Sequence, residues 1–245
     1  MSETSYMGMP IPKCYQTLNK VFEAGLDRVI LYGPPGTGKT YAGLTSHIGE
    51  SQSFRLVCTE DMTSAEVSGA FMPSADGGFH WMDGLATKAW RTGGRLVIDE
   101  IDKASGDVFA LLLSFTDSIA SASLDLPTGE RIVPAPGFSV IMTSNIEHPD
   151  ELPVALRDRF PVALKIDSAH PAALVQLPEE LRMVAATIVA SKPGRRASLR
   201  AFYAFQQLRQ VMDVMEAAEQ IFGPNLASSI VDAVKVGTLS IEVTL

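Results

Sequence analysis

The sequence is poor in cysteine, and the two that it has, Cys14 and Cys58, lie far apart with no Cys-x-x-Cys spacing. This arrangement argues against a disulfide framework and against a cysteine-based zinc site. No His-Glu-x-x-His grouping occurs either, so the sequence carries no sign of a metalloprotease helix. We expect both cysteines to be small, buried, apolar side chains in a reducing compartment.

Long apolar runs are also missing. No run reaches the length of about 18 residues that a membrane-spanning helix needs. The N-terminal stretch up to Pro12 is polar, includes Pro10, and contains no apolar core of a signal peptide. We therefore expect a soluble, cytoplasmic protein without a membrane partner.

Positive charge is in short supply. The chain has 20 Lys and Arg residues against 28 Asp and Glu residues, which gives a net charge of −8. A dedicated nucleic-acid binder usually carries a basic footprint, so this balance argues against one. A hydrophobic content of 46% and a charged content of 20% are typical of a globular protein, and 245 residues allow one large or two modest domains with a core.

One stretch that is present stands out. Residues 33–40 read GPPGTGKT, follow an apolar run, and fit the phosphate-loop pattern G-x-x-x-x-G-K-[ST]. Glycines let backbone N–H groups close around phosphate oxygens, and a following helix start adds partial positive charge. Lys39 would reach the β- and γ-phosphates, and the Thr40 hydroxyl would ligate Mg²⁺. The alternative is an ordinary Gly/Pro-rich turn. The nucleotide-binding residues predicted here are Gly33, Pro34, Pro35, Gly36, Thr37, Gly38, Lys39, Thr40 and the adjoining Tyr41.

Short apolar runs separated by longer segments predict the fold class. Most of the separating segments are long enough for crossover helices, so the pattern predicts an α/β fold with a parallel sheet and helices on both faces. Ligands of such sheets lie at the carboxyl ends of the strands, where residues 33–40 fall. The five candidate core strands are 29–32, 54–58, 95–99, 138–143 and 162–166.

The sequence pattern changes after Ile166. From there on, prolines separate segments with helical periodicity, and no further apolar run typical of a strand is predicted. We expect an N-terminal arm over 1–13, an α/β nucleotide-binding domain over 14–169 and a small all-helical lid over 170–245. Helix-period apolar residues mark the segments 14–26, 178–191, 198–221 and 225–237.

The apolar run at 95–99 ends in two adjacent acids, Asp99 and Glu100. Carboxylates at the edge of a buried sheet need partners. Beside a phosphate loop, Asp99 can hold Mg²⁺ through water, and Glu100 can polarise an attacking water. A solvated pair of acids at a strand end is the alternative.

GPPGTGKT at 33–40 together with LVIDEID at 96–102 resembles an AAA+ ATPase of the MoxR branch, which includes dynein-related and cobalt-chelatase-like ATPases. The resemblance covers nearly the whole chain. It implies a five-stranded P-loop sheet with a helical lid, and hydrolysis of ATP to ADP and phosphate with Mg²⁺. It also implies a homo-oligomeric ring, often a hexamer in relatives, with nucleotide at the subunit interface.

Three further residues match motifs of this family. Asn145 ends an apolar strand and resembles sensor 1, which would contact the attacking water or the γ-phosphate. Arg159 precedes Phe160 in a segment similar to the one that carries the arginine finger, although Arg157 is an alternative for that role. Arg200 resembles sensor 2, with Leu199 in place of the family's proline.

Two inserts also match the branch. Residues 69–84 are rich in glycine and aromatics and resemble the helix-2 insert, whose aromatic side chains could grip a partner or pack onto their own domain. Residues 124–133 predict a short hairpin around Thr128-Gly129, similar to the hairpin that precedes sensor 1.

The function implied by the resemblance is that of a chaperone that uses ATP to remodel or activate a partner protein. Insertion of a metal or cofactor into the partner is one form that this activity could take. Relatives often act with a protein bearing a von Willebrand A domain. The chain ends after the helical segment, so we expect such a partner to be a separate protein. The alternatives are a nucleic-acid-linked motor or loader, and a small-molecule kinase. No guanine-reading Asn/Thr-Lys-x-Asp segment occurs, which favours ATP.

Overall fold

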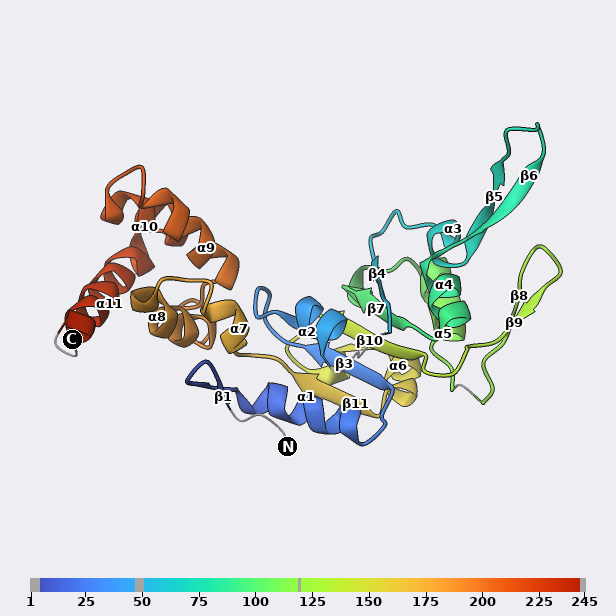
Figure 1. Cartoon of the computed structure of the whole chain (residues 1–245), viewed down its shortest axis with the longest axis horizontal. Helices are drawn as coiled ribbons and strands as arrows, with labels where there is room; N and C mark the ends of the chain where they lie inside the picture. Colours follow the sequence, from blue (N-terminus) through green and yellow to red (C-terminus); the bar gives the residue numbers. More distant parts are fainter. Residues whose placement is uncertain (1–4, 47–50, 119, 243–245) are drawn as a thin grey trace. The chain divides into compact units, whose positions relative to one another are not determined.

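The structure of the chain is a computed structural model that describes residues 5–46, 51–118 and 120–242 (Figure 1). Residues 1–4 of the expected arm and 243–245 of the expected lid lie outside the described residues. Contacts divide the chain into two compact units. One unit contains Leu18–Gly33 and Lys39–Lys165, and the other contains the segment up to Thr17, Pro34–Gly38 and the chain from Ile166 onward.

A five-stranded, all-parallel sheet forms the centre of the first unit, in the order β11-β3-β10-β7-β4. Each predicted apolar run became a strand within about two residues at either end, which confirms the predicted α/β fold class. The strands are β3 (Arg28–Tyr32), β4 (Ser53–Val57), β7 (Arg95–Asp99), β10 (Ser139–Ser144) and β11 (Val162–Lys165).

The sheet is apolar along its central strands because helices cover it. Leu96, Val97 and Ile98 of β7 are all fully buried, as expected for a strand with both faces covered. Gly43 lets its helix lie close to the sheet, since an added Cβ would meet side-chain atoms of Val97 and Ile141 at 3.3 Å. The α-helices that belong wholly to this unit are α2 (Lys39–Thr45), α3 (Ser64–Val67), α4 (Leu85–Thr92), α5 (Gly106–Phe115) and α6 (Val154–Arg159).

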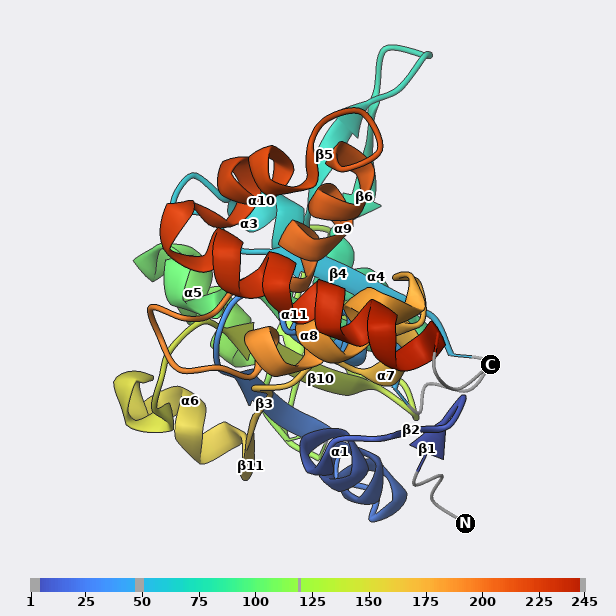
Figure 2. The ribbon, with the colours of Figure 1, turned by 90° about the vertical axis from the view of Figure 1, so that its left-hand side faces the viewer.

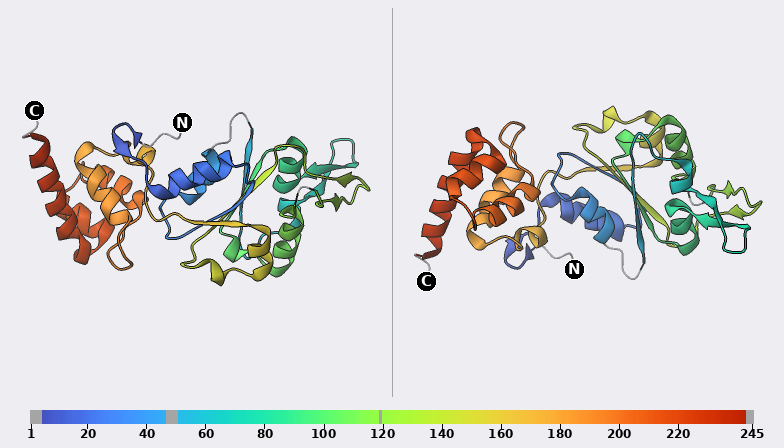
Figure 3. Two further views of the ribbon diagram at one scale, coloured as in Figure 1. Left: turned by 90° about the horizontal axis from the view of Figure 1, so that it is seen from below. Right: turned by 90° about the horizontal axis from the view of Figure 1, so that it is seen from above.

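Two antiparallel hairpins extend from the same end of the α/β unit (Figures 1 and 3). The first pairs β5 (Gly69–Pro73) with β6 (Phe79–Asp83), and the second pairs β8 (Leu124–Asp125) with β9 (Arg131–Ile132). The second confirms the hairpin predicted around Thr128-Gly129. The first shows that the glycine-rich insert at 69–84 is itself a hairpin.

The helices after residue 170 form a core of their own, with α8 to α11 packed around buried Leu181, Phe202, Phe205 and Ile230 (Figure 2). The division into domains at residue 170 stays a prediction. The helices are α7 (Pro171–Leu174), α8 (Glu179–Val189), α9 (Leu199–Leu208), α10 (Val214–Phe222) and α11 (Pro224–Glu242).

The segment 198–221, predicted from helix-period apolar residues, forms two helices. The chain leaves the helix after Leu208 and begins α10 at Val214. Asp213 explains the restart, because its carboxylate accepts hydrogen bonds from the backbone N–H groups of Met215 and Glu216. An aspartate at this position stabilises a new helix start more than it stabilises a helix interior.

The N-terminal part contains a small two-stranded pairing of β1 (Ser5–Tyr6) with β2 (Met9–Pro10), followed by α1 (Lys13–Glu23). Helix α1 confirms the helix predicted over 14–26, and it ends two residues before Gly25, which has a positive φ of 75°. Short 3₁₀ turns occur at η1 (Ile101–Lys103) and η2 (Pro149–Glu151).

Candidate functional site

The loop between β3 and α2, which the sequence predicts to bind phosphate, turns at glycines with positive φ angles. Gly33, Gly36 and Gly38 have positive φ angles of 124°, 76° and 96°, which residues with side chains rarely adopt. Lys39 begins α2, and its Nζ donates a hydrogen bond to the carbonyl oxygen of Gly33 at 2.8 Å. The three glycines of the predicted pattern therefore lie at positions whose backbone conformation favours glycine.

Side chains from three elements meet at the carboxyl ends of β7 and β10. The Thr40 hydroxyl donates to Oδ1 of Asp99 at 2.9 Å, and Lys39 Nζ donates to Oδ1 of Asn145 at 2.9 Å. Nδ2 of Asn145 lies 3.5 Å from Oε1 of Glu100. The structure thus brings together the five residues of this unit that were predicted to bind Mg²⁺, contact phosphate or activate water. They are Lys39, Thr40, Asp99, Glu100 and Asn145. Their catalytic roles stay predictions.

Asp99 is the most heavily bonded of these side chains. Its Oδ1 accepts from the hydroxyls of Thr40 and Thr143, and its Oδ2 accepts from the Arg55 guanidinium, with Nε at 3.1 Å and Nη2 at 2.5 Å. Burial raises the pKa of Asp99, but the hydrogen bonds from Thr143, Arg55 and Thr40 and the charge of Arg55 outweigh it, so the pKa lies below its usual value. Asp99 is therefore a carboxylate at neutral pH.

Glu100 has an unusual backbone. Its φ and ψ angles are 57° and 47°, in the left-handed region. A non-glycine residue there costs about 1–3 kcal/mol and is often found at functional sites. The Oε2 of Glu100 accepts from Lys103 Nζ at 2.6 Å, and this hydrogen bond raises the pKa of Lys103. The geometry turns the Glu100 backbone sharply away from the strand that ends at Asp99.

The donor set at Asp99 fits Mg²⁺. A threonine hydroxyl and a carboxylate 2.9 Å apart are the hard oxygen ligands that this ion prefers. Within the described residues no group of three or more His, Cys, Asp or Glu side chains could hold a metal. The ion would therefore take its remaining ligands from water and phosphate oxygens, as Mg²⁺ commonly does.

The two candidate finger arginines lie on α6 and bond to acids outside this cluster. Arg159 Nε donates to Asp117 Oδ1 at 3.0 Å, and Arg157 Nη1 donates to Asp150 Oδ1 at 2.7 Å. Tyr41, predicted as a nucleotide contact, is 59% exposed on α2. The roles of these three residues stay predictions.

Within the second unit, the start of α9 lies against Gly36. Ser198 caps α9 by accepting from the N–H of Ala201, and the N–H of Leu199 donates to the carbonyl oxygen of Gly36 at 3.3 Å. Arg200 is exposed in the first turn of the same helix. The structure therefore places the predicted sensor 2 segment beside the loop residue Gly36.

Three residues at the site were missed from the sequence. Arg55 and Thr143 bond to Asp99, and the Tyr15 hydroxyl donates to the carbonyl oxygen of Thr37 at 2.9 Å. A positive charge inside the run 54–58 was the one available signal for Arg55. Nothing in the local sequence distinguished Thr143 or Tyr15 from strand and helix residues.

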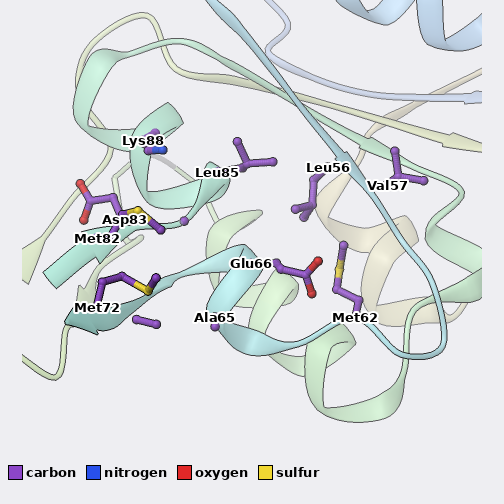
Figure 4. A pocket seen from close by; sticks show the side chains of 12 residues that line it. Leu56, Val57, Met62, Ala65, Glu66, Met72, Met82, Asp83, Leu85 and Lys88 are labelled. Carbon is purple, nitrogen blue, oxygen red and sulfur yellow. The ribbon is translucent and has the colours of Figure 1, made fainter.

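A separate pocket of about 470 Å³ lies beneath the first hairpin, and none of the predicted site residues lines it. In Figure 4, Met72 and Met82 of the hairpin lie on one side of the pocket and Leu56 and Met62 lie on the other. Flexible methionine side chains suit surfaces that adapt to different partners.

Comparison with known proteins identifies the family of the chain. A family model described as "AAA domain (dynein-related subfamily)" matches residues 28–160, more than half of the chain. This match confirms the family resemblance drawn from the motifs.

None of the helices, over the residues that the structure describes, is long and apolar enough to cross a membrane.

Several curated proteins are similar over part of their length. The denitrification regulatory protein NirQ of Stutzerimonas stutzeri is 28% identical over 180 residues, which cover 72% of this chain and 62% of that protein. NirQ of Pseudomonas aeruginosa is 32% identical, with coverage of 59% and 55%. Protein CbbQ of Hydrogenophilus thermoluteolus is 29% identical, with coverage of 58% and 54%. The chain thus spans between half and two thirds of the length of these relatives.

Proposed function

The chain belongs to the dynein-related subfamily of AAA ATPase domains, and we propose that it hydrolyses ATP in a ring and uses the cycle to remodel or activate a partner protein. The observation that carries the proposal is the cluster at the ends of β7 and β10. There Asn145 contacts Lys39 at 2.9 Å and Glu100 at 3.5 Å. Beside them, Thr40 contacts Asp99 at 2.9 Å.

Each residue of the cluster has a distinct task in this proposal. Thr40 and Asp99 would hold Mg²⁺, which supplies charge neutralisation at the phosphates when bound. Lys39 brings a buried ammonium to the same place, where it stabilises negative charge on the transferring group. Glu100 orients a water and takes up its proton, and Asn145 fixes the position of that water or of the γ-phosphate.

Assembly into a ring of identical chains supplies the remaining charge. Arg159 is our candidate for the residue that reaches the nucleotide of a neighbouring copy, where a guanidinium stabilises the transition state. It would have to release Asp117, an ion pair with both side chains partly exposed, and such pairs contribute about 0–1 kcal/mol. Arg200 at the start of α9 would sense the γ-phosphate from within the same chain.

The first hairpin is our candidate for the contact with the partner protein. Phe71 is 48% exposed and Phe79 is 72% exposed on one of its faces, and the methionine-lined pocket lies under the other. The name of NirQ describes a regulatory protein, which fits a chain that acts on other proteins. Metal or cofactor insertion and a separate von Willebrand A partner belong to this proposal through the family resemblance alone.

Phosphate release at a series of protein concentrations tests the ring. If a neighbour completes each site, turnover per subunit rises with concentration until assembly is complete. Constant turnover per subunit over the whole range in which the chain assembles would contradict shared hydrolysis. A phosphorylated acceptor in place of free phosphate would point to a kinase, and stimulation by DNA that weakens with salt would point to a nucleic-acid motor.

A further inference from the structure

Arg55 forms an ion pair with Asp99 that the hydrolysis described above does not use. It lies in β4, an edge strand of the sheet, and pairs in register with Val97 of β7. Its Nη2 is 2.5 Å and its Nε 3.1 Å from the same carboxylate oxygen, Oδ2 of Asp99. The carboxylate proposed to hold Mg²⁺, Asp99, is therefore paired with a positive charge of the chain itself, the Arg55 guanidinium.

Both oxygens of Asp99 are occupied in this structure. Oδ1 accepts two hydroxyl hydrogen bonds, from Thr40 and Thr143, and Oδ2 accepts the guanidinium. The hydroxyls carry no net charge, so they orient the carboxylate without neutralising it. Among the groups that hydrogen-bond to Asp99 in the described part of the chain, the Arg55 guanidinium carries the positive charge that would compete with a metal ion.

We propose that Arg55 is a counter-ion of Asp99 that competes with Mg²⁺, so that Arg55 sets the Mg²⁺ concentration at which the nucleotide is held. The inference rests on the proposed function, because it assumes that nucleotide and Mg²⁺ bind at Thr40 and Asp99. Arg55 is here a positioning residue that acts through Asp99.

The exposure of the two partners makes such an exchange feasible. The Arg55 side chain is 47% exposed and that of Asp99 only 5%. The arginine can turn into solvent, where its charge is hydrated, while the two threonine hydroxyls keep Asp99 in place. An arginine that stays close to Mg²⁺ would repel it, and this repulsion is screened but not removed at a half-exposed position.

A purely structural role for Arg55 leads to a different expectation. If the guanidinium only stabilised the buried carboxylate, its removal would lower the stability of the fold and would leave Asp99 free but misplaced. Mg²⁺ would then bind no more tightly than before. The two readings therefore differ in the direction in which Mg²⁺ affinity changes.

The test is a titration of ADP binding against free Mg²⁺, followed with a fluorescent ADP analogue on the full chain. Arg55→Gln and Arg55→Met remove the charge, and Arg55→Lys keeps it. The matched control is Arg131→Gln, which removes an arginine paired with Asp125 at 3.7 Å within the second hairpin.

We expect the half-saturating Mg²⁺ concentration to fall about threefold to tenfold in the two neutral variants and to stay near the wild-type value in Arg55→Lys and Arg131→Gln. Unchanged or higher half-saturating concentrations in the neutral variants would overturn the inference and leave the proposed function standing. A wild-type chain that binds no ADP at any Mg²⁺ concentration would overturn both. Thermal unfolding without Mg²⁺ identifies a variant that fails to fold, in which case the other neutral variant decides.

Discussion

The ammonium of Lys39 donates a hydrogen bond to the side-chain oxygen of Asn145 at 2.9 Å. This bond joins the first residue of α2 to the residue after β10. The side chains of the predicted phosphate-binding lysine and the predicted sensor residue are therefore in direct contact. In the proposed site, both side chains would lie near the γ-phosphate.

Replacing Asn145 separates its role from that of Lys39. In Asn145→Ala we expect nucleotide binding to persist and turnover to fall about tenfold or more, because the attacking water loses its orientation. In Lys39→Ala we expect nucleotide binding itself to be lost. Binding of a fluorescent ATP analogue and phosphate release measure the two effects.

Asn225→Ala is the control for this pair, since Asn225 is an exposed asparagine at the start of α11. It should change neither binding nor turnover. An Asn145→Ala variant with wild-type turnover would remove Asn145 from the catalytic machinery.

Gly36 is expected to tolerate no side chain. An added Cβ would lie 2.3 Å from the Cβ of Ser198, and the φ angle is 76°. We expect Gly36→Ala to lower the free energy of unfolding and to weaken ADP binding, with overpacking alone costing about 1–3 kcal/mol. Thermal unfolding with and without ADP measures both effects.

Gly77 offers a matched control for the strain. Its φ angle is 83°, and an added Cβ would meet no atom within 4 Å. Gly77→Ala therefore suffers the left-handed backbone strain without the clash. If the two variants lost the same stability, contact with Ser198 would have no part in the effect.

The acid sensitivity of the fold should depend on Asp99. Its folded-state pKa lies below the usual value, so its bonds stabilise the fold above the unfolded pKa of about 3.9. That contribution is lost as pH falls through the lower folded-state value. Between pH 5 and pH 3 wild type should therefore lose more unfolding free energy than Asp99→Asn.

Thermal or urea unfolding at a series of pH values checks this. From about pH 6 to pH 8 the two curves should run parallel, because Asp99 stays ionised in both the folded and the unfolded state there. Curves that remain parallel down to pH 3 would show that the bonds from Arg55, Thr40 and Thr143 do not favour the ionised form.

Arg91 should couple the two hairpins. Its Nε donates to Asp83 of β6 at 2.7 Å, and its Nη1 and Nη2 donate to Glu130, between β8 and β9, at 2.7 and 2.6 Å. In Arg91→Ala we expect faster hydrogen exchange in β8 and β9 and basal ATP turnover within about twofold of wild type. Arg131→Ala is the control, because its ion pair with Asp125 stays within one hairpin.

The sequence predicted the parts of the site that follow from strand topology. Continuous apolar residues, as in 95–99, were enough to predict the strands. Because the strands are parallel, their carboxyl ends bring Asp99 and Asn145 to one edge of the sheet. No knowledge of tertiary contacts is needed to place these two residues there. Strand topology places only the residues that directly end a strand or begin a helix.

The rest depends on contacts that no local pattern encodes. Arg55 occupies an alternate position in β4, where a charge normally faces solvent, and only the neighbouring strand shows that it meets Asp99. The division of the helix-period segment 198–221 into two helices depends on the side-chain cap at Asp213. Tyr15 contacts Thr37 across a distance in sequence that periodicity cannot bridge.

In the proposed ring, Glu100 of one copy and an arginine of its neighbour complete a single hydrolytic site. Glu100→Gln should retain nucleotide and lose about 10²–10⁴-fold in turnover, and Arg159→Ala should also be inactive alone. The most direct measurement is phosphate release by an equal mixture of these two variants, with Arg157→Ala tested in the same way. We predict that the mixture regains about a quarter of wild-type turnover, because a random ring pairs an intact Glu100 with an intact Arg159 at that fraction of its interfaces. A mixture no more active than the sum of its two components, with either arginine variant, would contradict a hydrolytic site shared between neighbouring copies.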